Sequence, residues 1–93
     1  MDIRPVARQS APMIENATSA DAIVDARGLL CPLPVLKARK RLAALSGGQV
    51  LQLVADDPAA VVDVPHFCAQ AGHTLLSVTE RDGARVYLLK RGA

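Results

Sequence analysis

The sequence contains almost no aromatic residues: it has one phenylalanine, one tyrosine and no tryptophan among 93 residues. Hydrophobic residues still make up 51% of the chain, so we expect an aliphatic core, which is small in a domain of this length. The scarcity of aromatic rings counts against recognition of single-stranded RNA, because that recognition depends on bases stacking on such rings.

Long hydrophobic runs are also missing, and no stretch is long enough to cross a bilayer. Residues 1–20 carry charges of both signs and no continuous apolar segment, which argues against a secretory signal. We therefore expect a cytoplasmic protein without a membrane partner. These residues also lack a hydrophobic period, so we predict a mobile tail over residues 1–20 and one domain over residues 21–93.

Cysteine is scarce as well: Cys31 and Cys68 are the two cysteines, and they form no Cys-x-x-Cys pair. In a reducing compartment we expect both to be free thiols. Cys68 lies near His66 and His73 in the sequence, but a metal site needs ligands that converge, and Cys68 belongs to the apolar stripe of a predicted helix. We predict that Cys68 lies in the core and that there is no metal site. The sequence places neither histidine next to Cys31, which argues against a Cys-His hydrolase dyad.

Hydrophobic periodicity predicts an α+β fold. The expected elements, in chain order, are strand 22–26, helix 32–46, strand 49–55, helix 58–71, strand 74–80 and strand 85–90. The order β-α-β-α-β-β is most simply packed as a two-layer α/β sandwich, with two helices on one face of a four-stranded mixed sheet. An Asp-Gly pair predicts a hairpin between the last two strands.

Three further features of these elements follow from particular residues. The stripes that should face the sheet are Val35, Ala38, Leu42 and Leu45 in the first helix and Val61, Val64, Cys68 and Ala71 in the second. We expect Pro65 to bend or interrupt the second helix. Tyr87 is expected on the open face of the sheet.

The segment Leu-Cys-Pro-Leu-Pro at residues 30–34 stands where the first helix begins. Proline is tolerated in a first helical turn, because its missing N–H would have no partner within the helix. We therefore place Cys31 at the N-cap and Pro32 at the first helical position. Pro34 lies in the same turn, and Gly28 supplies the flexible backbone that leads into it.

This position predicts an activated thiol at Cys31. The Leu33 amide and the positive end of the helix dipole are expected to point at the sulfur and to favour the thiolate. The pKa of Cys31 should then lie below the roughly 8.5 of a free cysteine. The alternative is a small structural cysteine that happens to precede a helix.

The first predicted helix is strongly basic. Its four charged residues are Lys37, Arg39, Lys40 and Arg41, and it contains no acidic residue. We predict that they form a docking face for an acidic partner, the alternative being a solvated face. Arg39 differs from the other three because it interrupts the flank of the apolar stripe.

Asp56 and Asp57 precede Pro58 at the start of the second predicted helix. Asp57 is a favourable N-cap and Pro58 a favourable first helical residue. The capping role leaves Asp56 without an explanation. We therefore keep both carboxylates as possible support for the site of Cys31.

An exposed thiol without a second catalytic group can accept and pass on another group. It can hold a sulfane sulfur as a persulfide, or it can act as a redox sensor that forms a sulfenic acid or a mixed disulfide. A third alternative is an RNA- or protein-binding module that uses the basic helix without sulfur chemistry. The residues themselves leave these alternatives open.

The segment Gly28–Pro34 resembles the Cys-Pro-x-Pro signature of the TusA/SirA-like sulfur-carrier family. The order and spacing of Asp56-Asp57-Pro58, Phe67-Cys68 and His73 resemble that family too, and the similarity extends over residues 23–91. The resemblance implies the same β-α-β-α-β-β sandwich. It also implies a sulfurtransferase in which Cys31 holds a covalent persulfide and no separate cofactor is needed.

The resemblance further implies partners. The sulfur would come from a cysteine desulfurase or a rhodanese-type donor and pass to a downstream acceptor protein of a sulfur relay. In relatives the relay serves tRNA thiolation, sulfur oxidation or cofactor assembly, and we do not expect direct tRNA binding. Leu33 stands where one tRNA-thiolating relative has glutamate, so the choice of partner is expected to differ.

Overall fold

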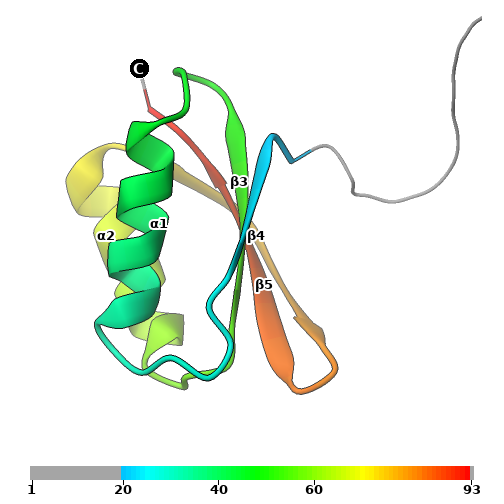
Figure 1. Cartoon of the computed structure of the whole chain (residues 1–93). Coiled ribbons are helices and arrows are strands. Elements are labelled where there is room, and N and C mark those ends of the chain that lie inside the picture. Colours follow the sequence, from blue (N-terminus) through cyan, green and yellow to red (C-terminus); the bar gives the residue numbers. More distant parts are fainter. Residues whose placement is uncertain (1–19, 93) are drawn as a thin grey trace, which may run out of the picture.

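The computed structural model describes residues 20–92, so the predicted tail lies outside the described residues except for Ala20. The sheet has four strands in the order β2-β3-β5-β4, in which β2 and β3 are parallel and the other neighbours antiparallel. Both helices cover the same face of this sheet (Figure 1). The predicted two-layer α+β sandwich is therefore confirmed. The elements are β2 (Ala22–Asp25), α1 (Leu33–Ala43), β3 (Val50–Ala55), α2 (Ala60–Ala71), β4 (Thr74–Arg81) and β5 (Ala84–Lys90).

The core lies between the helices and the two middle strands. Leu51 and Leu53 of β3 are fully buried, and Leu89 of β5 pairs with Leu51 across the antiparallel ladder. Ala38 and Leu42 of α1 pack against this layer. Alternate residues of β3 and β5 thus bury their side chains beneath the helices, and the core is predominantly aliphatic, as predicted.

Tyr87 does not lie on the open face of the sheet, so that prediction is wrong. The register places Tyr87 opposite Leu53 on one side and Val78 on the other, on the face that the helices cover, and the side chain is 1% exposed. The reason is that alternation along β5 puts Tyr87 on the same face as Leu89. Its hydroxyl is buried without a hydrogen-bond partner among residues 20–92.

Helix α1 is shorter than predicted at both ends. It ends at Ala43, and the amides of Ala44 and Leu45 then donate to carbonyls three residues back, so the last turn tightens before the Gly47-Gly48 pair is reached. The glycines therefore belong to the loop and do not end the helix.

Helix α2 begins at Ala60, after a turn in which the Ala60 amide donates to the Asp57 carbonyl, so the predicted start at Pro58 is wrong. Pro65 does not interrupt it: the helix is continuous through the proline, which lies on its exposed side. Gly72 ends it with a φ of 80°, as predicted.

The buried stripe of α2 is shifted from the predicted one. Val64 and Cys68 face the core as predicted, whereas Val61 and Ala71 are exposed. Ala60 and Phe67 are buried in their place, because the turn before α2 changes which side of the helix meets the sheet.

Within residues 20–92, no helix has the length and apolar character that crossing a membrane requires.

The hairpin between β4 and β5 turns at Asp82 and Gly83. Both residues have positive φ, 53° for Asp82 and 81° for Gly83, which is the backbone that a type I′ turn requires. The predicted Asp-Gly hairpin is confirmed.

Candidate functional site

Cys31 lies in the loop between β2 and α1, and two carboxylates from the loop between β3 and α2 hold this loop. The Gly28 amide donates to Asp56 Oδ1 at 3.0 Å, and the Cys31 amide donates to Asp57 Oδ2 at 2.6 Å. Gly28 has a φ of 82°, a conformation that residues with a Cβ resist. Asp56, which the capping argument left unexplained, thus fastens the start of the loop, and Asp57 fastens its end at the thiol-bearing residue.

Asp57 has a second contact and is not itself the N-cap of α2. Its Oδ1 accepts the Ala59 amide at 3.2 Å, while Ala59 occupies the N-cap position. One carboxylate therefore joins the backbone before α1 to the backbone before α2. A hydrogen bond to a charged acceptor is stronger than one to a neutral acceptor, so this carboxylate is a substantial part of what positions Cys31.

The start of α1 differs from the predicted one by a residue. Pro32 is the N-cap and Pro34 the second helical residue, so Cys31 lies just outside the helix, joined to Pro32 by a cis peptide bond. The Leu33 amide donates to the Leu30 carbonyl at 2.9 Å. It is therefore not directed at the sulfur, and this part of the prediction is wrong.

The thiol faces a groove of about 250 Å³ between the two helices. From the side of α1 the groove is lined by Cys31, Pro32, Val35 and Arg39, and from α2 by Asp63, His66, Phe67 and Gln70. We call this the thiol groove. The four α2 residues follow the spacing i, i+3, i+4, i+7, which is one face of a helix.

The sequence analysis missed two polar residues of the thiol groove, Asp63 and His66. The sequence places neither histidine beside Cys31, but His66 lines the same groove in the folded chain. Their helical spacing with Phe67 and Gln70 marks them as one stripe, but only the packing of α2 beside α1 shows that the stripe meets the thiol. His73 lies elsewhere: its Nδ1 accepts the Gly92 amide at 3.0 Å.

The pKa of Cys31 is raised, which contradicts the predicted activation. A hydrogen bond with the Asp63 carboxylate is the largest cause, followed by desolvation and by the negative charges of Asp63 and Asp57. The helix dipole was expected to favour the thiolate, but carboxylates close to a sulfur favour the protonated thiol more strongly. At neutral pH Cys31 is therefore mainly a thiol.

Exposure separates the two cysteines clearly. Cys31 is exposed and flanked by leucines that are also exposed, Leu30 at 70% and Leu33 at 47%. Cys68 is buried in the core, as predicted, and burial raises the pKa of its thiol. Only Cys31 can therefore meet another macromolecule, and it does so from an apolar rim.

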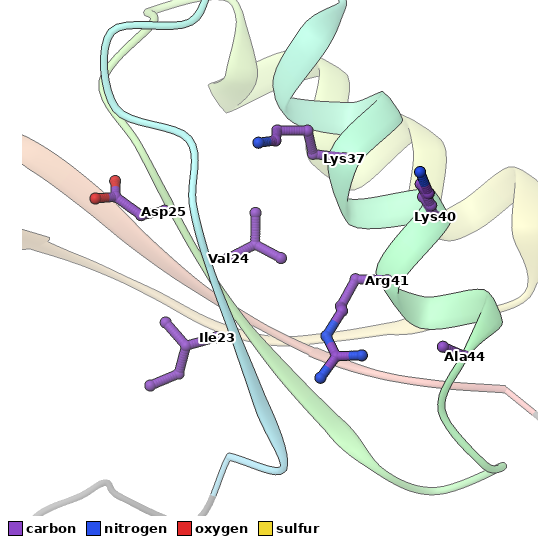
Figure 2. A pocket seen from close by; sticks show the side chains of 7 residues that line it. All are labelled: Ile23, Val24, Asp25, Lys37, Lys40, Arg41 and Ala44. Carbon is purple, nitrogen blue, oxygen red and sulfur yellow. The ribbon is translucent and has the colours of Figure 1, made fainter.

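The four cations of α1 do not form one face. Arg39 lines the thiol groove, whereas Lys37, Lys40 and Arg41 lie on the opposite side of the helix. There they border a second groove of about 500 Å³ beside strand β2 (Figure 2). A single docking face made of all four residues is thus wrong, because consecutive helical residues point about 100° apart.

No group of three or more histidine, cysteine, aspartate or glutamate side chains within residues 20–92 is arranged to hold a metal ion. His66 borders the thiol groove, His73 contacts Gly92 and packs its ring 5.5 Å from that of Phe67, and Cys68 is buried. These three residues, which lie near one another in the sequence, thus have three different environments.

Comparison with known proteins places the chain among sulfur-handling proteins. The family described as "Sulfurtransferase TusA" matches residues 22–91. A sulfur carrier protein TusA from Allochromatium vinosum is 45% identical over 71 residues, which cover 76% of this chain and 93% of the relative. A sulfur carrier protein TusA from Pseudomonas entomophila is 41% identical over 73 residues, covering 78% and 91%.

A solved structure also shares the fold. The SirA-like protein from Desulfitobacterium hafniense superimposes with a TM-score of 0.69 at 27% identity, covering 77% of this chain and all but 1% of the other. Its match agrees with the two helices and four-stranded mixed sheet described above.

The carboxylate of Asp57 should contribute measurably to stability. Asp57→Ala removes the acceptor of both the Cys31 and Ala59 amides, and we expect the free energy of unfolding in urea to fall by about 1–3 kcal/mol. Asp57→Asn keeps one acceptor oxygen and should lose less. Hydrogen exchange at the Cys31 amide should accelerate in Asp57→Ala. An unchanged exchange rate would show that the amide does not depend on this carboxylate.

The pKa of Cys31 should fall when Asp63 loses its charge. In Asp63→Asn the main cause of the raised pKa is gone, so more thiolate is present at pH 7, and alkylation by iodoacetamide should be roughly threefold faster or more. The pH profile of alkylation would be measured in both proteins, with the Cys68→Ser background used throughout. A wild-type midpoint below that of a free cysteine would contradict the raised pKa.

Proposed function

The chain belongs to the TusA family of sulfurtransferases, and from this premise we propose that Cys31 carries a sulfane sulfur between proteins. The observation that supports this most directly is the presentation of Cys31. It is the exposed one of the two cysteines, it lies at the end of a loop fastened by Asp56 and Asp57, and it faces a groove large enough for part of a partner.

The proposed transfer is a thiol–persulfide exchange. The sulfur of Cys31 attacks the terminal sulfur of a donor's persulfide, a new S–S bond forms on Cys31, and the donor's S–S bond breaks to release its cysteine thiolate. The proton from the Cys31 thiol ends on that departing thiolate, so nothing is oxidised or reduced overall. The loaded Cys31 then gives its terminal sulfur to an acceptor cysteine by the same exchange.

The raised pKa of Cys31 fits a carrier that reacts only within a complex. In the isolated protein, Asp63 and Asp57 keep the sulfur mainly protonated and therefore weakly reactive. A partner that brings a cation to Asp63 would weaken its effect on the thiol and release the thiolate at the moment of transfer. Asp63 lies within the thiol groove, where a docked partner can reach it.

The thiol groove also indicates what the donor surface is like. Arg39 supplies one positive charge from α1, and the exposed Leu30 and Leu33 supply an apolar rim beside the thiol. We propose that the donor, a cysteine desulfurase or a rhodanese-type protein, docks with an apolar contact around its reactive cysteine and an acidic residue against Arg39. A downstream relay protein would receive the sulfur at the same groove.

The two alternatives have weaker support. Both aromatic residues of the chain, Phe67 and Tyr87, are buried, so neither can stack with an RNA base. A redox sensor typically has a low-pKa thiol near a resolving cysteine, whereas the pKa of Cys31 is raised and Cys68 is buried in the core. Persulfide transport needs neither a low-pKa thiol in the isolated protein nor a resolving cysteine.

Loading is the first test of the proposed function. After incubation with a cysteine desulfurase and cysteine, or with a rhodanese and thiosulfate, the intact mass should rise by one sulfur atom, about 32 Da. Cys31→Ser should gain none, and Cys68→Ser, whose thiol is buried, should load like the wild type. A Cys68→Ser protein that folds but is not loaded would contradict the assignment of Cys31 as the sulfur acceptor.

Docking at the thiol groove should depend on Arg39. Arg39→Glu reverses a groove charge without removing core volume, so transfer from an acidic donor should slow by about 3- to 10-fold, mainly through association, and the difference should shrink at high salt. Lys40→Glu makes the same charge change on the other side of α1 and should transfer like the wild type. Equal slowing in both variants would mean that only net charge matters.

A further inference from the structure

The groove between α1 and the edge strand β2 has no role in the proposed transfer. It holds about 500 Å³, and its lining residues are Ile23, Val24 and Asp25 of β2, Lys37, Lys40 and Arg41 of α1, and Ala44, which follows the helix (Figure 2). None of these residues lines the thiol groove. We call it the edge groove, and whatever occupies it leaves Cys31 accessible.

The positive charges of the edge groove are not balanced by acids of the described chain. Within residues 20–92, no carboxylate forms a salt bridge with Lys37, Lys40 or Arg41. The acid that lines the groove, Asp25, is already held by Arg27 through hydrogen bonds of 2.9 Å from Nε and from Nη2. This pairing, with a smaller contribution from the positive charge of Lys37, lowers the pKa of Asp25 to about 2, so its charge is engaged mainly by a neighbour outside the groove.

Strand β2 offers a backbone edge along the same groove. Among the described strands, β2 pairs only with β3, so its other side presents unpaired N–H and C=O groups. Residues 22–25 extend for about 10 Å. Lys37, Lys40, Arg41 and Ala44 follow the spacing i, i+3, i+4, i+7 and form a row of about the same length on the helix above.

One face of β2 lies against α1 and the other is exposed, and this difference determines which side chains an added strand would need on each face. Val24 points toward α1 and packs against the core, whereas Ile23 points to the opposite face and is 65% exposed (Figure 2). Side chains of an added strand would alternate in the same way. Those on the helix side would lie beneath the three cations, and those on the other side would lie beside Ile23.

We propose that the edge groove binds an extended acidic segment of a partner protein, which adds to β2 as a fifth strand. The segment would alternate acidic residues, which face Lys37, Lys40 and Arg41, with apolar residues, which cover Ile23. Main-chain hydrogen bonds to β2 would supply affinity, and the charges would supply selectivity. A second copy of this chain fits poorly, because pairing two β2 edges would bring two rows of cations together.

The first test measures binding of a fluorescein-labelled peptide, Glu-Val-Glu-Val-Glu-Val, to the full-length protein by fluorescence anisotropy. The double substitution Lys40→Glu and Arg41→Glu should weaken binding by about tenfold or more. Arg39→Glu in the thiol groove, Lys90→Glu at the exposed end of β5 and Cys31→Ser should each bind within about twofold of the wild type. Unchanged binding by the double variant would overturn the proposal.

The second test separates strand addition from charge attraction alone. The same peptide with N-methyl groups on alternate amides keeps its charge but cannot pair with an edge strand, so it should lose most of its affinity. In ¹H–¹⁵N spectra the amides of Ile23–Asp25 should shift and exchange more slowly with the unmodified peptide. Equal affinity of the N-methylated peptide would overturn the proposal. Tighter binding of a uridine 20-mer would also overturn it, and so would sedimentation of the protein as a dimer that pairs through β2. None of these readouts involves sulfur transfer.

Discussion

Two short hydrogen bonds join the two loops on which the site depends. The carboxylates of Asp56 and Asp57, which follow β3, accept the amides of Gly28 and Cys31, which follow β2. The parallel pairing of β2 with β3 brings both loops to the same edge of the sheet. This contact fixes where the thiol lies and brings negative charge close to it. Asp57 therefore positions the thiol and also contributes, after Asp63, to its raised pKa.

The opposing charges around Cys31 come from different helices. Asp63 of α2 raises the pKa of the thiol, and Arg39 of α1 lies in the same groove. Under the proposed function, a partner docked in the thiol groove would meet both charges, and the complex rather than the isolated protein would determine when Cys31 reacts. The carboxylate of Asp63 also explains why the basic helix α1 does not lower the pKa of Cys31.

The sequence was sufficient for the order of elements, the Asp-Gly hairpin and the burial of Cys68, because periodicity and turn chemistry are local. It was insufficient for features that depend on packing. The approach of Asp63 and His66 to Cys31 follows from the way α2 lies beside α1, and no local pattern records it. Tyr87 was assigned to the wrong face because the register with Leu53 determines its side. Helical spacing already separates Arg39 from the other three cations of α1, but only the packing of α2 and β2 around the helix shows that the two sets border different grooves.

The fastening of Cys31 by the β3–α2 loop also limits how the site can be moved or inherited. Residues 28 and 31 depend on partners 28 and 26 positions later in the chain. A Cys-Pro-Leu-Pro segment grafted alone into another strand–helix turn would keep its prolines but lose both acceptors. Transplanting the site therefore requires both loops and the parallel strands that align them. Over evolutionary time, substitutions at Asp56 and Asp57 should be accompanied by changes in the cysteine loop, since each carboxylate accepts a backbone amide of that loop.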